Sequence, residues 1–83
     1  MIQFSILTLQ GSLYEGKADY ISVPAIDGWL GILPNHIPLI TSLKSGKITI
    51  RSKGGEQGID IERGFIEVRP RSEVVVLATT HKQ

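Results

Sequence analysis

The side chains that could do chemistry in this chain are few and scattered. His36 and His81 lie far apart in the sequence, and neither has a second histidine or a carboxylate at metal-ligand spacing. Asp60 and Glu62 fall on the same side of an alternating segment, which is usually a solvated face, and nothing frames them as an acid–base pair in a cleft. The seven serines have no histidine and carboxylate partners in an elbow motif. We therefore expect no catalytic residue, no metal site and no cofactor, and interpret His36 as a turn or interface histidine bonded to the backbone.

Two further patterns resemble ligand sites but have simpler readings. Gly54-Gly55 could suggest a phosphate loop, yet no helix follows it to supply an N-terminal dipole, so a hairpin turn is the better interpretation. Arg63, Arg69 and Arg71 form a small basic patch in the sequence, which we interpret as a docking rim. The aromatic residues are too few and too dispersed for a platform on which nucleic-acid bases could stack.

The most unusual stretch is 27–38, which combines two glycines and two prolines with a high density of apolar residues. A solvent-exposed loop would be more polar, and a helix would not tolerate so many breakers. The pattern predicts a structured, partly buried bend with an exposed tip. Trp29 lies in this tip between glycines, and we expect it to be exposed and to anchor an interface, the alternative being a packed loop tryptophan.

Length and composition bound the elements that position these residues. A chain of 83 residues predicts one domain, 1–83, near the lower size limit for a single core. There is no cysteine, which excludes disulfides and thiolate metal sites. The net charge of +1 argues against non-specific nucleic-acid binding. No apolar run approaches the ~20 residues that cross a bilayer, so we expect any membrane association to depend on a partner.

Alternation of apolar and polar residues predicts short strands separated by turns. The expected strands are 2–9, 12–16, 17–23, 39–43, 47–51, 59–62, 65–68 and 73–78. We expect a bulge or two-sided cover at Leu7, an end to the third strand at Pro24, a turn at 70–72 and fraying of the tail 79–83. The apolar run 73–78 predicts a central strand covered on both faces. The fold class is therefore all-β, an antiparallel two-sheet sandwich or flattened barrel of eight to ten short strands.

Three ordered blocks that together cover nearly the whole chain resemble one family. Segment 27–40, Asp-Gly-Trp-Leu-Gly-Ile-Leu-Pro-Asn-His-Ile-Pro-Leu-Ile, resembles the Gly-Glu-Leu-Gly-Ile-Leu-Pro-Gly-His-Ala-Pro-Leu signature of the epsilon subunit of F-type ATP synthases, and Lys44-Ser45-Gly46 matches a Lys-Pro-Gly that follows it. Segment 63–68, Arg-Gly-Phe-Ile-Glu-Val, resembles the family's Gly-Gly-Phe-Leu-Glu-Val. Segment 74–78, Val-Val-Val-Leu-Ala, is similar to its Val-Thr-Val-Leu-Ala strand.

The resemblance implies an amino-terminal β-sandwich at the foot of the rotor, non-catalytic and without a cofactor, which couples the gamma subunit to the c-ring during proton- or sodium-driven ATP synthesis. It implies a protein that is monomeric when isolated, that binds no nucleic acid, and that sits peripherally, without inserting, on the cytoplasmic or equivalent face of an energy-transducing membrane. The residues carried over as facing the c-ring are Asp27, Gly28, Trp29, Leu30 and Gly31. Those carried over as facing gamma are Leu9, Gln10, His36 and Thr41.

This chain departs from the family pattern at three points. Trp29 stands where the family commonly has a glutamate, so an apolar or cation–π contact is expected in place of a charged one. Asn35 replaces a glycine, which asparagine tolerates well if the backbone there is left-handed. The sequence stops after the last strand, so the family's inhibitory pair of carboxy-terminal helices is expected to be absent. The alternative function is a free-standing small β-barrel that binds sugar or single-stranded nucleic acid.

Overall fold

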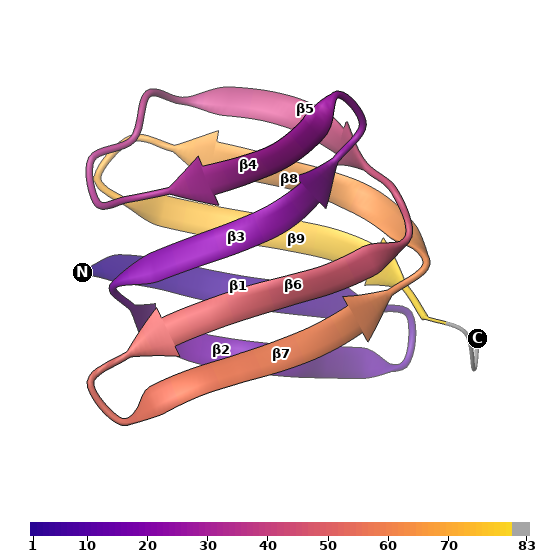
Figure 1. The fold of residues 1–83 in the computed structure, drawn as a ribbon, viewed down its shortest axis with the longest axis horizontal. Helices are drawn as coiled ribbons and strands as arrows, with labels where there is room; N and C mark the ends of the chain where they lie inside the picture. Colours follow the sequence, from indigo (N-terminus) through magenta and orange to yellow (C-terminus); the bar gives the residue numbers. More distant parts are fainter. Residues whose placement is uncertain (81–83) are drawn as a thin grey trace.

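The computed structural model describes residues 1–80, and these form nine strands (Figure 1). The strands are β1 Ile2–Thr8, β2 Gly11–Ala18, β3 Tyr20–Ala25, β4 Gly28–Ile32, β5 Leu39–Leu43, β6 Gly46–Ser52, β7 Gly55–Ile61, β8 Arg63–Arg69 and β9 Glu73–Thr79. The expectation of an all-β domain of eight to ten short strands is confirmed. None of the described residues belongs to a helix long and apolar enough to cross a membrane.

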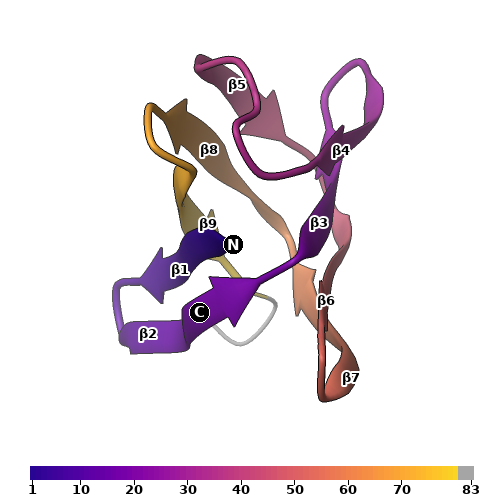
Figure 2. The same ribbon diagram turned by 90° about the vertical axis from the view of Figure 1, so that its left-hand side faces the viewer.

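The nine strands make one strongly curled sheet whose two halves face each other (Figures 1 and 2). Hydrogen bonding runs in the order β2-β1-β9-β8-β5-β3-β6-β7, with β4 paired to β3. One wall holds β2, β1, β9, β8 and β5, and the other holds β4, β3, β6 and β7. All pairs are antiparallel except β1 with β9, which run parallel, so the expectation of a wholly antiparallel sheet is wrong at that pair. The first and last strands of the sequence are therefore neighbours in the middle of one wall.

The core fills the space between the two walls with the inward side chains of the alternating strands. The largest side chains with under 2% of their surface exposed are Phe4, Ile2, Ile6, Ile21, Ile32, Ile48, Ile50, Ile61, Ile66, Val23, Val74 and Val76. Burial of one such side chain stabilises the fold by roughly 1.5–3 kcal/mol, and no buried residue of the described chain is polar or charged. The period-two pattern therefore specifies which face of each strand lies inside.

The segment 17–25 does not form the strand expected from its sequence. The chain bends at Asp19, whose backbone N–H donates to the carbonyl of Arg51 at 2.8 Å, and β3 then runs through Pro24 to Ala25. Pro24 is tolerated because its carbonyl accepts from the N–H of Lys44 at 2.9 Å, on the side of β3 away from β4. The missing N–H of Pro24 would point to that same side, so pairing with β4 loses no hydrogen bond.

The apolar stretch 27–38 is also different from the single bend that its glycines and prolines suggest. Residues Gly28–Ile32 are strand β4, which pairs with β3, and the chain bends only before and after it. Gly28 has φ of +129°, a conformation that side-chain-bearing residues rarely adopt, and it completes the tight turn from β3. The actual loop is 33–38, between β4 and β5.

Three smaller expectations concern β1, β8 and β9. The register of β1 against β2 shifts between Ile6 and Leu7, which confirms the bulge. The chain break before 65–68 falls at Glu62, not at Arg63-Gly64, so β8 is longer than expected. Strand β9 is central, between β1 and β8, but it is covered on one face only, because Leu77 is 56% exposed. The expected frayed tail 79–83 is wrong at Thr79, which belongs to β9, and its residues 81–83, His81 included, lie outside the described residues.

Candidate interaction surface on strands β4 and β5

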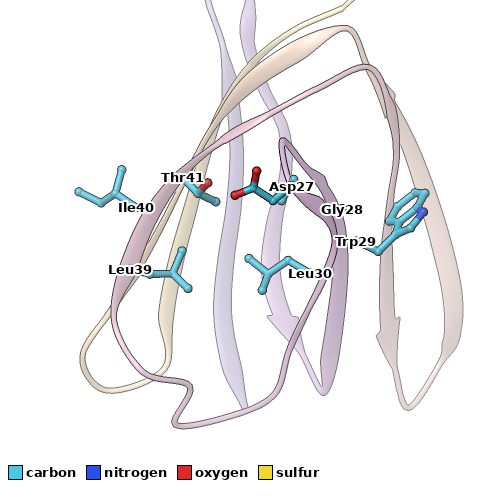
Figure 3. Close-up of a pocket in the computed structure, with 8 residues that line it drawn as sticks. Asp27, Gly28, Trp29, Leu30, Leu39, Ile40 and Thr41 are labelled. Atoms are coloured by element: carbon cyan, nitrogen blue, oxygen red, sulfur yellow. The ribbon is translucent and has the colours of Figure 1, made fainter.

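A shallow open groove of about 310 Å³ lies between β4 and β5, at the edge where the two walls separate (Figure 3). Its lining residues are Ala25, Asp27, Gly28, Trp29, Leu30, Leu39, Ile40 and Thr41. Leu30 and Leu39 point toward one another across it and pack on the core, so the groove has an apolar floor. All four of the non-aromatic residues expected to face the c-ring lie in or directly beside this groove, in β4 and the turn before it.

Trp29 is confirmed as an exposed residue, with 68% of its surface accessible. Its side chain lies on the outer face of β4 and points away from the groove (Figure 3). Its strand partner is Pro24, and a Cβ built at Gly46 would lie 3.9 Å from the indole Cη2, so the ring extends along Pro24 toward Gly46. The tryptophan is therefore anchored along one edge, while most of its surface is available to a partner.

The outer face of β4 continues into a second aromatic contact. The Tyr20 side chain covers Gly31, where a Cβ would lie 2.6 Å from the tyrosine hydroxyl oxygen. The guanidinium of Arg51 lies over the same tyrosine ring, 5.4 Å from its centroid, a cation–π arrangement. Gly31 thus lies in a regular strand at a point where the Tyr20 side chain approaches the backbone closely.

Several large exposed apolar side chains lie on β4 and β5 and in the turn and loop that adjoin β4. They are Ile26 at 56%, Trp29 at 68%, Leu33 at 60%, Ile37 at 78% and Ile40 at 72%. Single exposed apolar residues are normal on a protein surface, but a group on one edge marks an interaction site. Strand β4 also has neither a charged residue nor a proline, the usual features that protect an edge strand from pairing. This edge is the best candidate for a partner-binding surface.

The loop 33–38 closes one end of the groove and carries His36. The His36 Nδ1 donates to the carbonyl oxygen of Ile37 at 2.7 Å, and the His36 backbone N–H donates to the carbonyl of Leu33 at 3.2 Å. The expected backbone-bonded turn histidine is therefore confirmed. Asn35 has φ of +65°, which confirms that this position is left-handed.

The residues expected to face gamma do not gather at one place. Thr41 lines the groove, next to the residues expected to face the c-ring. His36 lies at the end of the sheet that holds the β8–β9 turn, because its neighbour Asn35 bonds to Ser72. Leu9 and Gln10 occupy the β1–β2 turn at the other end, since Leu7 pairs with Leu77 near the end of β9. A single partner that touched all four would extend along the length of the sheet.

Sequence reasoning missed a second apolar surface, on the outer face of β1, β9 and β8. It is an open hollow of about 440 Å³ whose exposed apolar side chains include Leu9 at 93%, Phe65 at 58% and Leu77 at 56%. Leu7 and Leu77 are strand partners, as are Leu77 and Phe65, so these side chains form a row across three strands. The signal was available: Ile66 is a core position, so the adjacent Phe65 must point outward.

The basic patch expected at Arg63, Arg69 and Arg71 does not exist as a unit. Arg63 and Arg69 begin and end the same strand, β8, and so lie at its two ends. Arg69 is paired with Glu67 at 3.1 Å and with Glu73 at 3.4 Å. The hydrogen bond and charge of Glu67, followed by those of Glu73, raise the pKa of the Arg69 guanidinium. The charge of Arg69 is offset by these two carboxylates, so the expected docking rim of three arginines is not formed.

The ionisable side chains of the described residues do not gather into a candidate metal site. No group of three or more histidine, cysteine, aspartate or glutamate side chains within residues 1–80 could hold a metal ion. The one aromatic ring pair of that region, Phe4 with Tyr14 at 5.7 Å between centroids, involves a fully buried phenylalanine.

Comparison with known proteins identifies the family. The family model described as the ATP synthase delta/epsilon chain β-sandwich domain matches residues 1–82. The chain belongs to this family. Its resemblance to epsilon subunits in the sequence blocks around β4, β8 and β9 is thereby confirmed.

Curated ATP synthase epsilon chains are similar over nearly all of this domain. That of Hydrogenovibrio crunogenus is 43% identical over 79 residues, which cover 95% of this chain and 54% of the relative. That of Alkalihalophilus pseudofirmus is 38% identical over 77 residues, covering 93% and 57% respectively. The epsilon-type domain described here thus spans little more than half the length of these relatives.

Solved ATP synthase structures contain the same fold. A chain in the mitochondrial ATP synthase of Euglena gracilis, from a structure of OSCP, F1 and the c-ring, superposes with a TM-score of 0.86 at 19% identity, covering 93% of this chain and 49% of the other. A chain in the Tetrahymena thermophila central stalk and c-ring superposes with a TM-score of 0.77 at 14% identity, covering 94% and 63%. At these identities the likeness establishes the fold of the epsilon-type domain.

Proposed function

We propose that this domain is a non-catalytic central-stalk element of an F-type ATP synthase, which couples the gamma subunit to the c-ring. The observation that carries the proposal is the match of the delta/epsilon β-sandwich family over residues 1–82. One relative of the same fold belongs to a structure of a central stalk and c-ring. Membrane association would then come through the complex, on the cytoplasmic or equivalent face, with protons or sodium as the coupling ion.

The mechanical role suits the fold, because a rotor needs a contact that does not yield under torque. The nine strands of the described chain are hydrogen-bonded into one continuous curled sheet, and the core holds no buried polar or charged residue. Interiors packed in this way transmit strain with little deformation. The sheet can therefore act as a rigid wedge, and its two exposed apolar surfaces give it two separate sites at which partner subunits can bind.

We assign the c-ring contact to the outer face and edge of β4, with Asp27, Gly28, Trp29, Leu30 and Gly31. The support is local: Trp29 is exposed on the outer face of β4, and β4, β5 and the segments that adjoin them carry other large exposed apolar residues. Aromatic side chains of this kind often dominate binding energy at interfaces. Trp29 takes the place that an acidic residue commonly has in the family, so this contact is expected to be apolar and only weakly sensitive to salt.

We assign the gamma contact to Leu9, Gln10, His36 and Thr41. Their spread along the sheet is compatible with a long contact that also covers the hollow formed by Leu7, Leu9, Phe65 and Leu77. The alternative, a sugar- or single-strand-binding module, finds no support, since the exposed aromatic residues Trp29 and Phe65 lie on opposite walls of the described fold.

The proposal is tested by mixing the domain with purified gamma subunit at mild salt and measuring heat of binding by titration calorimetry. A one-to-one complex is expected. A titration of the same domain with oligonucleotides and oligosaccharides, followed by fluorescence of its single tryptophan, serves as the control and should give no change. Absence of binding to gamma, or saturable binding to the oligonucleotides, would count against the assignment.

A further inference from the structure

Three residues other than glycine have left-handed backbone conformations, and all three lie at one end of the described fold. Asn35 has φ of +65°, Arg71 of +66° and Ser72 of +57°. Asn35 belongs to the β4–β5 loop and the other two to the β8–β9 turn, 37 residues further along. Such conformations are unfavourable for residues with a side chain, and they persist where the surrounding contacts enforce them.

One hydroxyl group connects the two segments. The Asn35 backbone N–H donates to the Ser72 Oγ at 2.7 Å, and that same hydroxyl donates to the Asn35 side-chain Oδ1 at 3.3 Å. The backbone carbonyl of Ser72 in turn accepts from the N–H of Gln3 at 2.8 Å. Ser72 is therefore fixed to β1 through its backbone and holds Asn35 through its side chain. We refer to the reciprocal Asn35–Ser72 pair as the loop clamp.

The β4–β5 loop has few other constraints of this kind. Both of its hydrogen bonds to a distant part of the described chain end on the Ser72 hydroxyl, whereas those of His36 stay within the loop. Two of the most exposed large apolar side chains of the domain, Leu33 and Ile37, flank the clamped residue on either side. A loop of this composition on a partner-binding edge would lose affinity if it had to be ordered during binding.

We propose that Ser72 is a positioning residue, which through Asn35 holds the loop 33–38 in the conformation that its partner binds. The proposal rests on the function proposed above, in which His36 of this loop faces gamma. Ser72 itself belongs to the β8–β9 turn, in the wall that also holds β5, and it acts on the loop through Asn35. A glycine at position 35 could adopt the left-handed conformation without help. Asparagine at this position is instead held in it by a reversible contact with the β8–β9 turn.

The first part of the test uses the isolated domain and does not require a partner. In Ser72→Ala the amide of Asn35 loses its acceptor, and its hydrogen-exchange protection should fall by about tenfold, the equivalent of one net hydrogen bond. Protection of the Val76 amide in the centre of the fold should not change. Ser72→Gly also removes the hydroxyl but relieves the backbone strain at φ of +57°, and it should give the same loss at Asn35. Ser45→Ala, an exposed serine in the β5–β6 connection, is the matched control.

The second part measures affinity for purified gamma. Both Ser72 variants should bind gamma about three- to tenfold more weakly than the wild type, with a melting temperature within about 5 °C of it, because the clamp is peripheral to the core. A merely structural serine would lower the melting temperature without this separate loss of affinity.

The possible outcomes are distinguishable. Unchanged protection at Asn35 in both variants, or a loss in Ser72→Ala that Ser72→Gly does not show, would overturn the clamp. A loss of protection with unaltered affinity for gamma would overturn the positioning role. If the wild type itself does not bind gamma, the proposed function fails, while the exchange data still report whether the clamp exists.

Discussion

Replacement of Gly64 by alanine tests whether β8 and β9, neighbouring strands of one wall, pair as closely as the rigid rotor role requires. Gly64 lies in β8 between Leu43 of β5 and Ala78 of β9. A Cβ at this position would overlap the backbone carbonyl oxygen of Leu77 and would lie 3.0 Å from the Cα of Ala78. Because the obstacle is backbone and not a side chain that can rotate, β8 and β9 must separate locally.

The size of the effect follows from that geometry. Overpacking typically costs 1–3 kcal/mol and occasionally more, and the backbone obstacle places Gly64→Ala at about 3 kcal/mol. For a domain of this size that corresponds to a fall in melting temperature of about 12–24 °C. Gly54→Ala is the control, since nothing lies within 4 Å of a Cβ there, and it should be neutral or slightly stabilising. The free energy of unfolding of both variants is measured by urea titration followed by circular dichroism. Equal stability of the two variants would refute the close packing of β8 on β9.

Further variants probe the core, the exposed surface of β4 and β5, and the loop 33–38. Ile66→Ala removes a fully buried side chain and should lower the free energy of unfolding in urea by about 2–5 kcal/mol. Ile40→Ala, at a position 72% exposed, should change it by less than about 0.5 kcal/mol. Equal effects would show that the inward face is misassigned. Trp29→Ala should unfold like the wild type to within about 1 kcal/mol but bind a gamma–c-ring assembly about 30-fold more weakly, and an unfolded variant would mean that the indole is part of the core. The Ser72 variants should separate loop order from global stability, as described above.

Much of the fold could be predicted because alternation is a local property. The pattern in 63–68 places Ile66 inside and Phe65 outside, and the paired glycines at 54–55 locate the β6–β7 hairpin. The parallel pairing of β1 with β9 was not predictable in this way. It joins the two ends of the described chain, and period-two patterning records which face is buried but not which strand is the neighbour.

The errors around β3 and β4 have a common origin. The structural effect of a proline or glycine depends on which strands and side chains lie beside it, and the sequence does not show these neighbours. Pro24 was expected to end a strand. It is tolerated because the N–H that it lacks would lie on the side of β3 away from β4, where no β4 hydrogen bond is lost. Gly31 suggested a bend, but it lies in a regular strand, where the Tyr20 side chain approaches it closely. The exposure of Trp29 was correctly predicted from its place between glycines, although in the structure it follows from alternation with the inward Leu30 and Ile32 of β4.

The central claim is that this domain bridges the gamma subunit and the c-ring, and the affinity of purified gamma for a detergent-solubilised c-ring tests it most directly. The measurement is made with and without a saturating amount of the domain, by surface plasmon resonance on the immobilised ring. If the domain is a coupling wedge, gamma should bind the ring more tightly in its presence, and Trp29→Ala should reduce that gain. An affinity of gamma for the ring that is the same with and without the domain would contradict the account.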